Sequence, residues 1–265
     1  MDVSGGVNQN GRFIRQVRVS PDADRSQYPF TLPAVGWLAN TDGLELGDGV
    51  TFLVGENGTG KSTLVEALAV AAGMNPEGGS QNFSFATRSS ESSLGDHLVL
   101  TRGTGKPRSR YFLRAESYYN VASEIERLDK EPGGGPRLLS FYGGTSPHER
   151  SHGESFLDLV VHRFRPQGLY LLDEPEAALS VQGCLALLAR FGELVHTGCQ
   201  LVVATHSPIL LALPEATIYQ IDEDGTLEHV AFDEALPVST TRSFLADPNR
   251  FFRYLFDAST DRPEP

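Results

Sequence analysis

A glycine-rich segment between an apolar strand and a helix carries the clearest chemical signature in this sequence. Residues 55–63 read GENGTGKST and match the pattern GxxxxGK[ST]. Glycines let successive backbone N–H groups point into one concavity, and the start of the following helix adds partial positive charge. Lys61 can reach the β and γ phosphates of a nucleotide, and Ser62 can offer its hydroxyl to Mg²⁺. We expect the whole loop to bind a nucleoside triphosphate, through Gly55, Glu56, Asn57, Gly58, Thr59, Gly60, Lys61, Ser62 and Thr63.

Two adjacent carboxylates follow a second apolar strand. Residues 169–172 form the strand, and Asp173 and Glu174 come directly after it. Because adjacent residues at a strand end point to different sides, Asp173 can face Mg²⁺ while Glu174 faces an attacking water. On its own, such a pair is commonly the N-cap region of a helix. Beside a phosphate-binding loop, it favours hydrolysis of the nucleotide.

A histidine follows a third apolar strand. Residues 201–204 lead into Thr205, His206, Ser207 and Pro208, where Ser207 is suited to cap a helix and Pro208 to begin it. An isolated histidine at such a place is usually a boundary residue. Ligands of layered α/β folds, however, gather at the carboxyl ends of parallel strands. We therefore expect His206 on the same sheet edge as the phosphates.

The segment from Ser151 to Ser155 reads SHGES and precedes a helix with an apolar face. It can be an ordinary capping arrangement, with one serine as the cap and Glu154 nearby. It can also be a second anion site, made of a serine hydroxyl, the N–H of Gly153 and the helix dipole. The residues alone leave both interpretations open.

The order of strands and helices predicts a layered α/β fold with a mostly parallel central sheet. Strands are expected at residues 13–19, 50–54, 97–101, 110–113, 169–172 and 201–204, with a closing hairpin at 217–221 and 227–231. Helices are expected at 62–72, around 121–128, and at 155–164, 181–196 and 248–256. In the last helix, we expect Phe252 and Phe256 to face inward. The stretch at 131–136, rich in glycine and proline, predicts a surface loop.

Composition excludes some functions. A net charge of −12 over 265 residues argues against non-specific nucleic-acid binding, because such binding depends on Lys and Arg neutralising phosphates. The basic stretch from Arg102 to Arg114 predicts a solvated hairpin edge or, alternatively, a contact with nucleic acid or a partner. The longest apolar run, 67–74, is too short to span a bilayer and the N-terminus lacks a signal-peptide pattern, so we expect a cytoplasmic protein. Cys184 and Cys199 are expected to be buried and reduced.

Taken together, GENGTGKST, SHGES, LYLLDEPEAALS and VVATHSP resemble the ordered motifs of the ABC-type ATPases. The glutamate of SHGE is more similar to the soluble branch of SMC-like and repair ATPases than to the transporter signature LSGGQ. The segment ATHSPILL, followed by the expected hairpin, resembles a family of predicted bacterial ATPases. Because only a short stretch separates Glu116 from Ser151, we expect a compact head without coiled-coil arms.

This resemblance implies a P-loop NTPase fold, with an N-terminal antiparallel β portion and a small helical subdomain beside the parallel sheet. It implies a single domain over residues 1–265. Its parts would be an N-terminal lobe at 12–115, a helical subdomain with the signature at 116–165, the rest of the nucleotide-binding core at 166–231 and a helical tail at 232–265.

The resemblance also assigns catalytic and metal-binding roles. Lys61 and the backbone amides of residues 58–62 would hold the phosphates of ATP. Ser62 and Asp173 would hold Mg²⁺. Glu174 would act as the general base towards water, and His206 would sense the γ-phosphate.

A second set of roles lies across a dimer interface. Ser151, Gly153 and Glu154 would contact the nucleotide bound by the opposite subunit, which gives a head-to-tail dimer with two shared sites. Glu116 stands where the family has a metal-contacting glutamine, and Ser180 where it has an aspartate.

The function implied is that of an ATPase, which hydrolyses MgATP to ADP and phosphate and acts as an ATP-driven conformational switch for an unknown protein partner. Three alternatives remain open. They are the nucleotide-binding subunit of a membrane transporter, a P-loop kinase acting on a small metabolite, and an ATPase of a DNA repair or phage-defence system.

Overall fold

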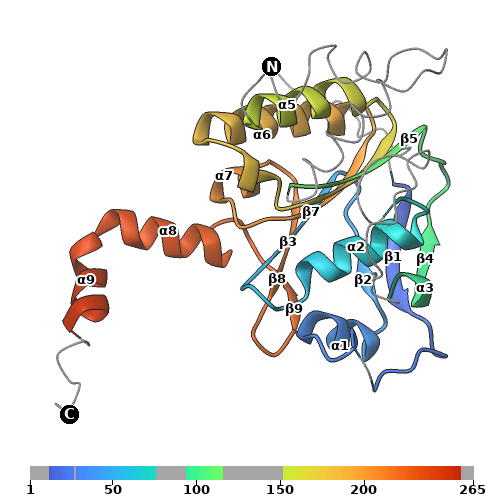
Figure 1. Ribbon diagram of the computed structural model, residues 1–265, viewed down its shortest axis with the longest axis horizontal. Coiled ribbons are helices and arrows are strands. Elements are labelled where there is room, and N and C mark those ends of the chain that lie inside the picture. Colours follow the sequence, from blue (N-terminus) through green and yellow to red (C-terminus); the bar gives the residue numbers. More distant parts are fainter. Residues whose placement is uncertain (1–11, 27, 76–93, 116–151, 258–265) are drawn as a thin grey trace, which may run out of the picture.

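The computed structural model describes residues 12–26, 28–75, 94–115 and 152–257. The expected helix around 121–128, the expected loop at 131–136 and the candidate residues Glu116 and Ser151 lie outside these ranges. Figure 1 shows a central sheet between two groups of helices, with the last two helices extending away from this body. None of the helices within the described ranges is long and apolar enough to cross a membrane.

A six-stranded sheet forms the centre of the described structure, in the order β5-β6-β7-β3-β8-β9. Its parallel strands are β3 (Val50–Gly55), β5 (Ser109–Arg114), β6 (Gly168–Asp173), β7 (Gln200–Ala204) and β8 (Thr217–Ile221). β9 (Leu227–His229) pairs antiparallel with β8 and closes the predicted hairpin. Every residue of β3, β6 and β7 is buried, as expected for parallel strands covered on both faces. The predicted mostly parallel sheet is confirmed.

Helices cover both faces of this sheet (Figure 1). One group comprises α1 (Pro33–Ala39), α2 (Lys61–Ala71) and the short α3 (Leu94–His97). The other comprises α5 (His152–Arg163), α6 (Val181–His196) and the short α7 (Pro208–Leu211). Adjacent residues of β3 enter different apolar clusters, with Leu53 packed among the first group and Phe52 among the second. The helix after the glycine-rich loop and the helix after SHGES therefore lie on opposite faces.

A second, antiparallel sheet contains β1 (Ile14–Val19), β2 (Leu44–Glu45) and β4 (Leu98–Arg102), in the order β2-β1-β4. Because β4 belongs to this sheet and β5 to the central one, the expected hairpin edge from Arg102 to Arg114 is wrong. The basic residues also differ in their surroundings. Arg110 donates to the carbonyl oxygen of Ala72 at 3.1 Å and Arg114 is ion-paired, whereas Arg102 is exposed.

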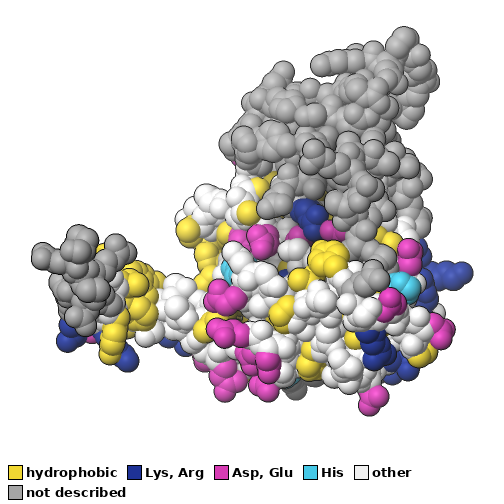
Figure 2. Space-filling model, turned by 60° about the horizontal axis from the view of Figure 1, so that its bottom comes forward, with side chains coloured by type: hydrophobic (Ala, Val, Ile, Leu, Met, Phe, Trp, Pro, Cys, Tyr) yellow, Lys and Arg dark blue, Asp and Glu magenta, His cyan; other side chains and the backbone are white. Residues whose placement is uncertain are grey.

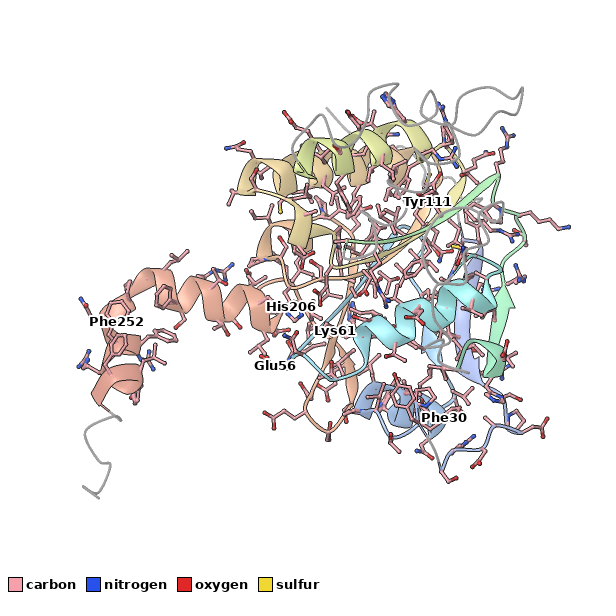
Figure 3. All side chains as sticks on the ribbon, viewed as in Figure 1. Phe30, Glu56, Lys61, Tyr111, His206 and Phe252 are labelled. Atoms are coloured by element: carbon pink, nitrogen blue, oxygen red, sulfur yellow. The ribbon has the colours of Figure 1, made fainter. Side chains whose placement is uncertain are left out.

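The chain ends in α8 (Leu236–Ala246), which packs against α7 and β3, and α9 (Pro248–Asp257), which packs against α8. The expected inward orientation of Phe252 and Phe256 is wrong, since they are 41% and 64% exposed. The ring of Phe252 lies 6.2 Å from that of Phe244 on α8, and apolar side chains of this tail lie open to solvent (Figures 2 and 3). The apolar pattern of α9 indicates that another element can pack against this helix. In the structure that element is α8 and not the central sheet.

Gln200, the first residue of β7, joins the two sheets. Its Oε1 accepts hydrogen bonds from the backbone N–H groups of Phe13 and Ile14, both at 2.9 Å. Its Nε2 donates to the carbonyl oxygens of Ile14 and Gly47, both at 2.8 Å. The residue is fully buried, and all the hydrogen-bonding capacity of its amide is used. Gln200 therefore fixes the start of β1 on the central sheet.

We expect the substitution Gln200→Leu to lower the free energy of unfolding by about 2–4 kcal/mol, because two N–H groups and two carbonyl groups lose their hydrogen bonds to the amide. Urea denaturation at constant m-value measures the change. The matched control is Gln182→Leu at an exposed position of α6, which should stay within about 0.5 kcal/mol of the wild type. Equal stability of the two variants would contradict the role given to Gln200.

Candidate functional site

Three strands of the central sheet end together and bring the predicted chemical groups to one edge. β7 pairs with β3 on one side and with β6 on the other, so that Ala204 lies beside both Leu53 and Asp173. The backbone continues this pairing beyond the strands, since the N–H of Glu174 donates to Ala204 at 2.9 Å and that of Thr205 to Leu53 at 3.1 Å. The glycine-rich loop, the carboxylate pair and His206 therefore share the carboxyl edge of the sheet.

The glycine-rich loop connects β3 to α2. Gly58 and Gly60 have φ angles of +85° and +99°, a region that side chains other than glycine rarely adopt. Gly60 is the N-cap of α2, and the carbonyl of Thr59 accepts a hydrogen bond from Ala34 of α1 at 2.9 Å. Of the other predicted binding residues, Glu56 and Asn57 are exposed at the tip of the loop, and Ser62 and Thr63 are half-buried at the start of α2.

Lys61 places a positive charge beneath this loop. The residue is 4% exposed, and its Nζ donates to the carbonyl oxygens of Gly55 at 2.8 Å and of Glu56 at 2.9 Å. An ammonium has three donors, and the described residues engage two of them, so one is available for a further acceptor such as a phosphate oxygen. Burial lowers the pKa of Lys61, and the nearby carboxylates of Glu174 and Asp173 oppose that shift. Figure 3 shows Lys61 in the same region as Glu56 and His206.

The two adjacent carboxylates have different surroundings. Asp173 is 4% exposed; its Oδ2 accepts a hydrogen bond from Nε of Arg114 at 3.0 Å, while its buried Oδ1 has no hydrogen-bond partner in the described part of the chain. Glu174 has a φ of +48°, which turns the chain sharply after β6. Its Oε1 lies 3.6 Å from Nε2 of His206, and its side chain is 35% exposed. One carboxylate is thus held inside and its neighbour is open to water.

These residues fit a magnesium ion. No group of three or more His, Cys, Asp or Glu that could hold a metal occurs among the described residues. Mg²⁺, however, is commonly bound by one or two protein oxygens together with substrate phosphates and water. The unpartnered Oδ1 of Asp173 is a suitable ligand of this kind, and the hydroxyl of Ser62 is a second.

Glu176, which the sequence motifs did not single out, supports His206. It lies in the 3-10 helix Pro175–Ala178, and its Oε1 accepts a hydrogen bond from the backbone N–H of His206. Burial raises the pKa of the Glu176 carboxyl, although its hydrogen bonds oppose the shift. The residue therefore ties the turn after β6 to the turn after β7. Only its place three residues after Asp173 could have suggested this contact.

The described part of the SHGES segment forms the start of α5. Within its described part, Gly153 packs against the turn after β6, where an added Cβ would lie 3.1 Å from the carbonyl oxygen of Ala178. Glu154 is exposed, and the next residues of α5 enter the apolar cluster on the face opposite α2. The structure therefore brings Lys61, Asp173, Glu174 and His206 together on one edge, and it places α5 across the sheet from the helix that carries Lys61.

Arg114, which the sequence pointed to only as part of an exposed basic stretch, is a second residue that the motifs missed. Its guanidinium contacts Asp173 and, through Nη2, Oε2 of Glu66 at 2.8 Å. The sequence does show a basic residue at the end of an expected strand. It indicates a contact with Asp173 only once the pairing of β5 with β6 is known.

The raised pKa of Glu176 predicts a pH-dependent effect of the substitution Glu176→Gln. A raised pKa in the folded state means that the neutral acid stabilises the fold below its ordinary value of 4.5, and that this contribution is lost as the pH rises through the folded-state pKa. The amide stays neutral and can still accept from His206. We therefore expect the melting temperature of the variant, relative to the wild type, to rise with pH above 4.5 and then level off.

Thermal denaturation from about pH 4 to about pH 8 measures this difference, because the range begins below the ordinary carboxyl pKa of 4.5 and extends well above it. The same substitution at the exposed Glu223 controls for the loss of one negative charge. A wild type that gains stability over Glu176→Gln as the pH rises would contradict the burial argument.

Residues 31–134 match the family described as an AAA domain, which is less than half of the chain. No curated protein matches the chain.

Two of the similar solved structures are an SMC head domain from Thermotoga maritima and a nucleotide-free ATP-binding cassette from an ABC transporter. The SMC head is 15% identical, with a TM-score of 0.39 and coverage of 71% of this chain and 92% of that one. The cassette is 17% identical, with a TM-score of 0.47 and coverage of 90% and 96%. At this level of similarity, only the residues of the chain itself indicate its function. The structure itself shows an α/β domain in which a glycine-rich loop joins a central parallel strand to a helix, and the family match covers this loop.

Proposed function

We propose that this protein binds MgATP and hydrolyses it to ADP and phosphate. The observation that carries the proposal is the buried ammonium of Lys61 between a glycine-rich loop and the carboxylates of Asp173 and Glu174. A buried cation with a free donor, beneath backbone amides and a helix N-terminus, is suited to the phosphates of a nucleotide.

The residues divide the work of hydrolysis between them. Amides of residues 58–62 and Lys61 bind the phosphates, and Ser62 with Oδ1 of Asp173 would hold Mg²⁺, which would supply positive charge to offset the charge that develops in phosphoryl transfer. Glu174 is open to water and accepts a proton from the water that attacks the γ-phosphorus. The bond from that phosphorus to the bridging oxygen breaks, and the electron pair leaves with ADP. His206, 3.6 Å from Glu174, contacts the γ-phosphate.

The active form is proposed to be a head-to-tail homodimer. The helix that begins in the SHGES segment, α5, packs on the face of the sheet opposite α2. The SHGES segment and the start of α2, which follows the glycine-rich loop, therefore lie on different faces of the sheet in one chain. Ser151, Gly153 and Glu154 of one copy would then complete the nucleotide site of the other. Glu116 remains a sequence-based candidate for a further metal ligand. The whole chain is proposed to act as one cytoplasmic ATPase domain, with the subdivisions given above, that switches a protein partner.

Replacement of the proposed base tests the chemistry. We expect Glu174→Gln to bind ATP with wild-type affinity and to lose turnover by at least about 100-fold, because the amide cannot accept the proton. Release of phosphate and equilibrium binding of ATP measure the two quantities. Size-exclusion chromatography with ATP and Mg²⁺ should show this variant accumulating as a dimer. Turnover at the wild-type rate would remove Glu174 from the mechanism.

A mixing experiment tests the shared sites. Lys61→Ala should be inactive because it cannot hold the phosphates, and Ser151→Arg should be inactive because it blocks the second anion site. In a mixed dimer, one site receives an intact loop from one copy and an intact SHGES segment from the other. With random pairing and independent sites, we expect about a quarter of the wild-type turnover in an equimolar mixture. Activity no higher than that of either variant alone would contradict the shared site.

A further inference from the structure

Arg114 forms an ion bridge between two carboxylates at the end of β5. Its Nε lies 3.0 Å from Oδ2 of Asp173, and its Nη2 lies 2.8 Å from Oε2 of Glu66. The three side chains are only 23%, 5% and 17% exposed, in the order Arg114, Asp173 and Glu66. Pairs on open surfaces contribute little because water screens them, whereas these groups are largely removed from water and depend on one another.

The bridge connects the two elements that carry the proposed metal ligands. Arg114 lies beside Asp173 in the register of β5 and β6. Glu66 lies on α2, four residues after Ser62, and therefore one helical turn along the same side of that helix. Through Arg114, the strand that carries Asp173 is tied to the helix that carries Ser62.

The guanidinium leaves one oxygen of Asp173 available. Oδ2 is held by Arg114, while the buried Oδ1 has no hydrogen-bond partner among the described residues. The guanidinium carbon lies 5.9 Å from the centre of the Phe112 ring, within the range of a cation–π contact. Burial by itself lowers the pKa of Arg114, but Asp173 and Glu66 outweigh it, so the pKa is raised and the charge is permanent.

We propose that Arg114 is a positioning residue for the metal site: it orients the carboxylate of Asp173 relative to Ser62 and leaves Oδ1 as the atom that binds Mg²⁺. The proposal rests on the proposed function, since it concerns the metal of bound MgATP. The opposite arrangement is a guanidinium that competes with Mg²⁺ for Asp173. The two arrangements predict opposite effects of removing Arg114 on magnesium-dependent binding of ATP. Loss of a competitor strengthens this binding, whereas loss of a positioning residue weakens it.

The test measures the affinity for ATP by isothermal titration calorimetry, once in Mg²⁺ and once in EDTA. The ratio of the two dissociation constants is the magnesium gain. We expect Arg114→Gln to reduce this gain at least about tenfold, as is typical for loss of a group that orients a metal ligand. Affinity in EDTA should change much less, because Lys61 and the loop still bind the phosphates. Arg114→Lys keeps the charge but not the planar fork, and should restore only part of the gain.

Two further variants separate this role from a general loss of structure. Arg110→Gln removes an arginine of the same strand that donates to the carbonyl of Ala72, and it should keep the wild-type magnesium gain. Glu66→Gln keeps Asp173 paired but removes one of the two anchors of Arg114, and should reduce the gain by an intermediate amount. Thermal denaturation without nucleotide shows whether Arg114→Gln folds. If it does not fold, the Glu66→Gln variant serves as the test.

The outcomes are distinct. A magnesium gain that is unchanged or larger in Arg114→Gln, or unchanged in Glu66→Gln, would overturn the positioning role while leaving ATP binding intact. Equal losses of affinity in Mg²⁺ and in EDTA would also overturn it, since they indicate a structural role. A wild type with no magnesium gain would instead contradict the proposed function itself.

Discussion

Burial of two positive charges among carboxylates is the constraint on which the site depends. Lys61 and Arg114 lie at the carboxyl edge of the central sheet, close to Asp173, Glu174 and Glu66. Unpaired charges in such a position would be costly, whereas each cation here contacts either carbonyl oxygens or carboxylates. These contacts therefore hold β5, β6 and α2 together at this edge. They leave one donor of the Lys61 ammonium and one oxygen of Asp173 available for a bound anion and its metal.

The rest of the fold serves to keep this edge in place. Parallel pairing of β6, β7 and β3 brings three chain segments, distant in sequence, to one line. Buried residues on both faces of these strands leave little freedom for them to shift, because a slip of one residue would exchange the two apolar clusters. Gln200 extends the same rigidity to the N-terminal sheet through four hydrogen bonds.

Sequence reasoning predicts the parts of this fold that depend on local pattern. The span of α6 and the strands around the glycine-rich loop agree with expectation because apolar periodicity, caps and glycines are local signals. Arg114, Glu176 and Gln200 escaped prediction because their roles arise only when strands far apart in the chain pair. The inward face expected for Phe252 was wrong for a related reason: periodicity identifies an apolar face but does not say which element covers it. Glu116 and Ser151 lie outside the described residues and stay predictions.

The most direct measurement of the central claim is a crystal structure with a non-hydrolysable ATP analogue and Mg²⁺. We expect the γ-phosphate to lie within hydrogen-bond distance of Lys61 and of the amides of residues 58–62, with the metal bound by Asp173 and Ser62. We also expect Ser151 of a second copy to face the same phosphates. An analogue bound away from Lys61, or a phosphate site completed by a single copy, would contradict it.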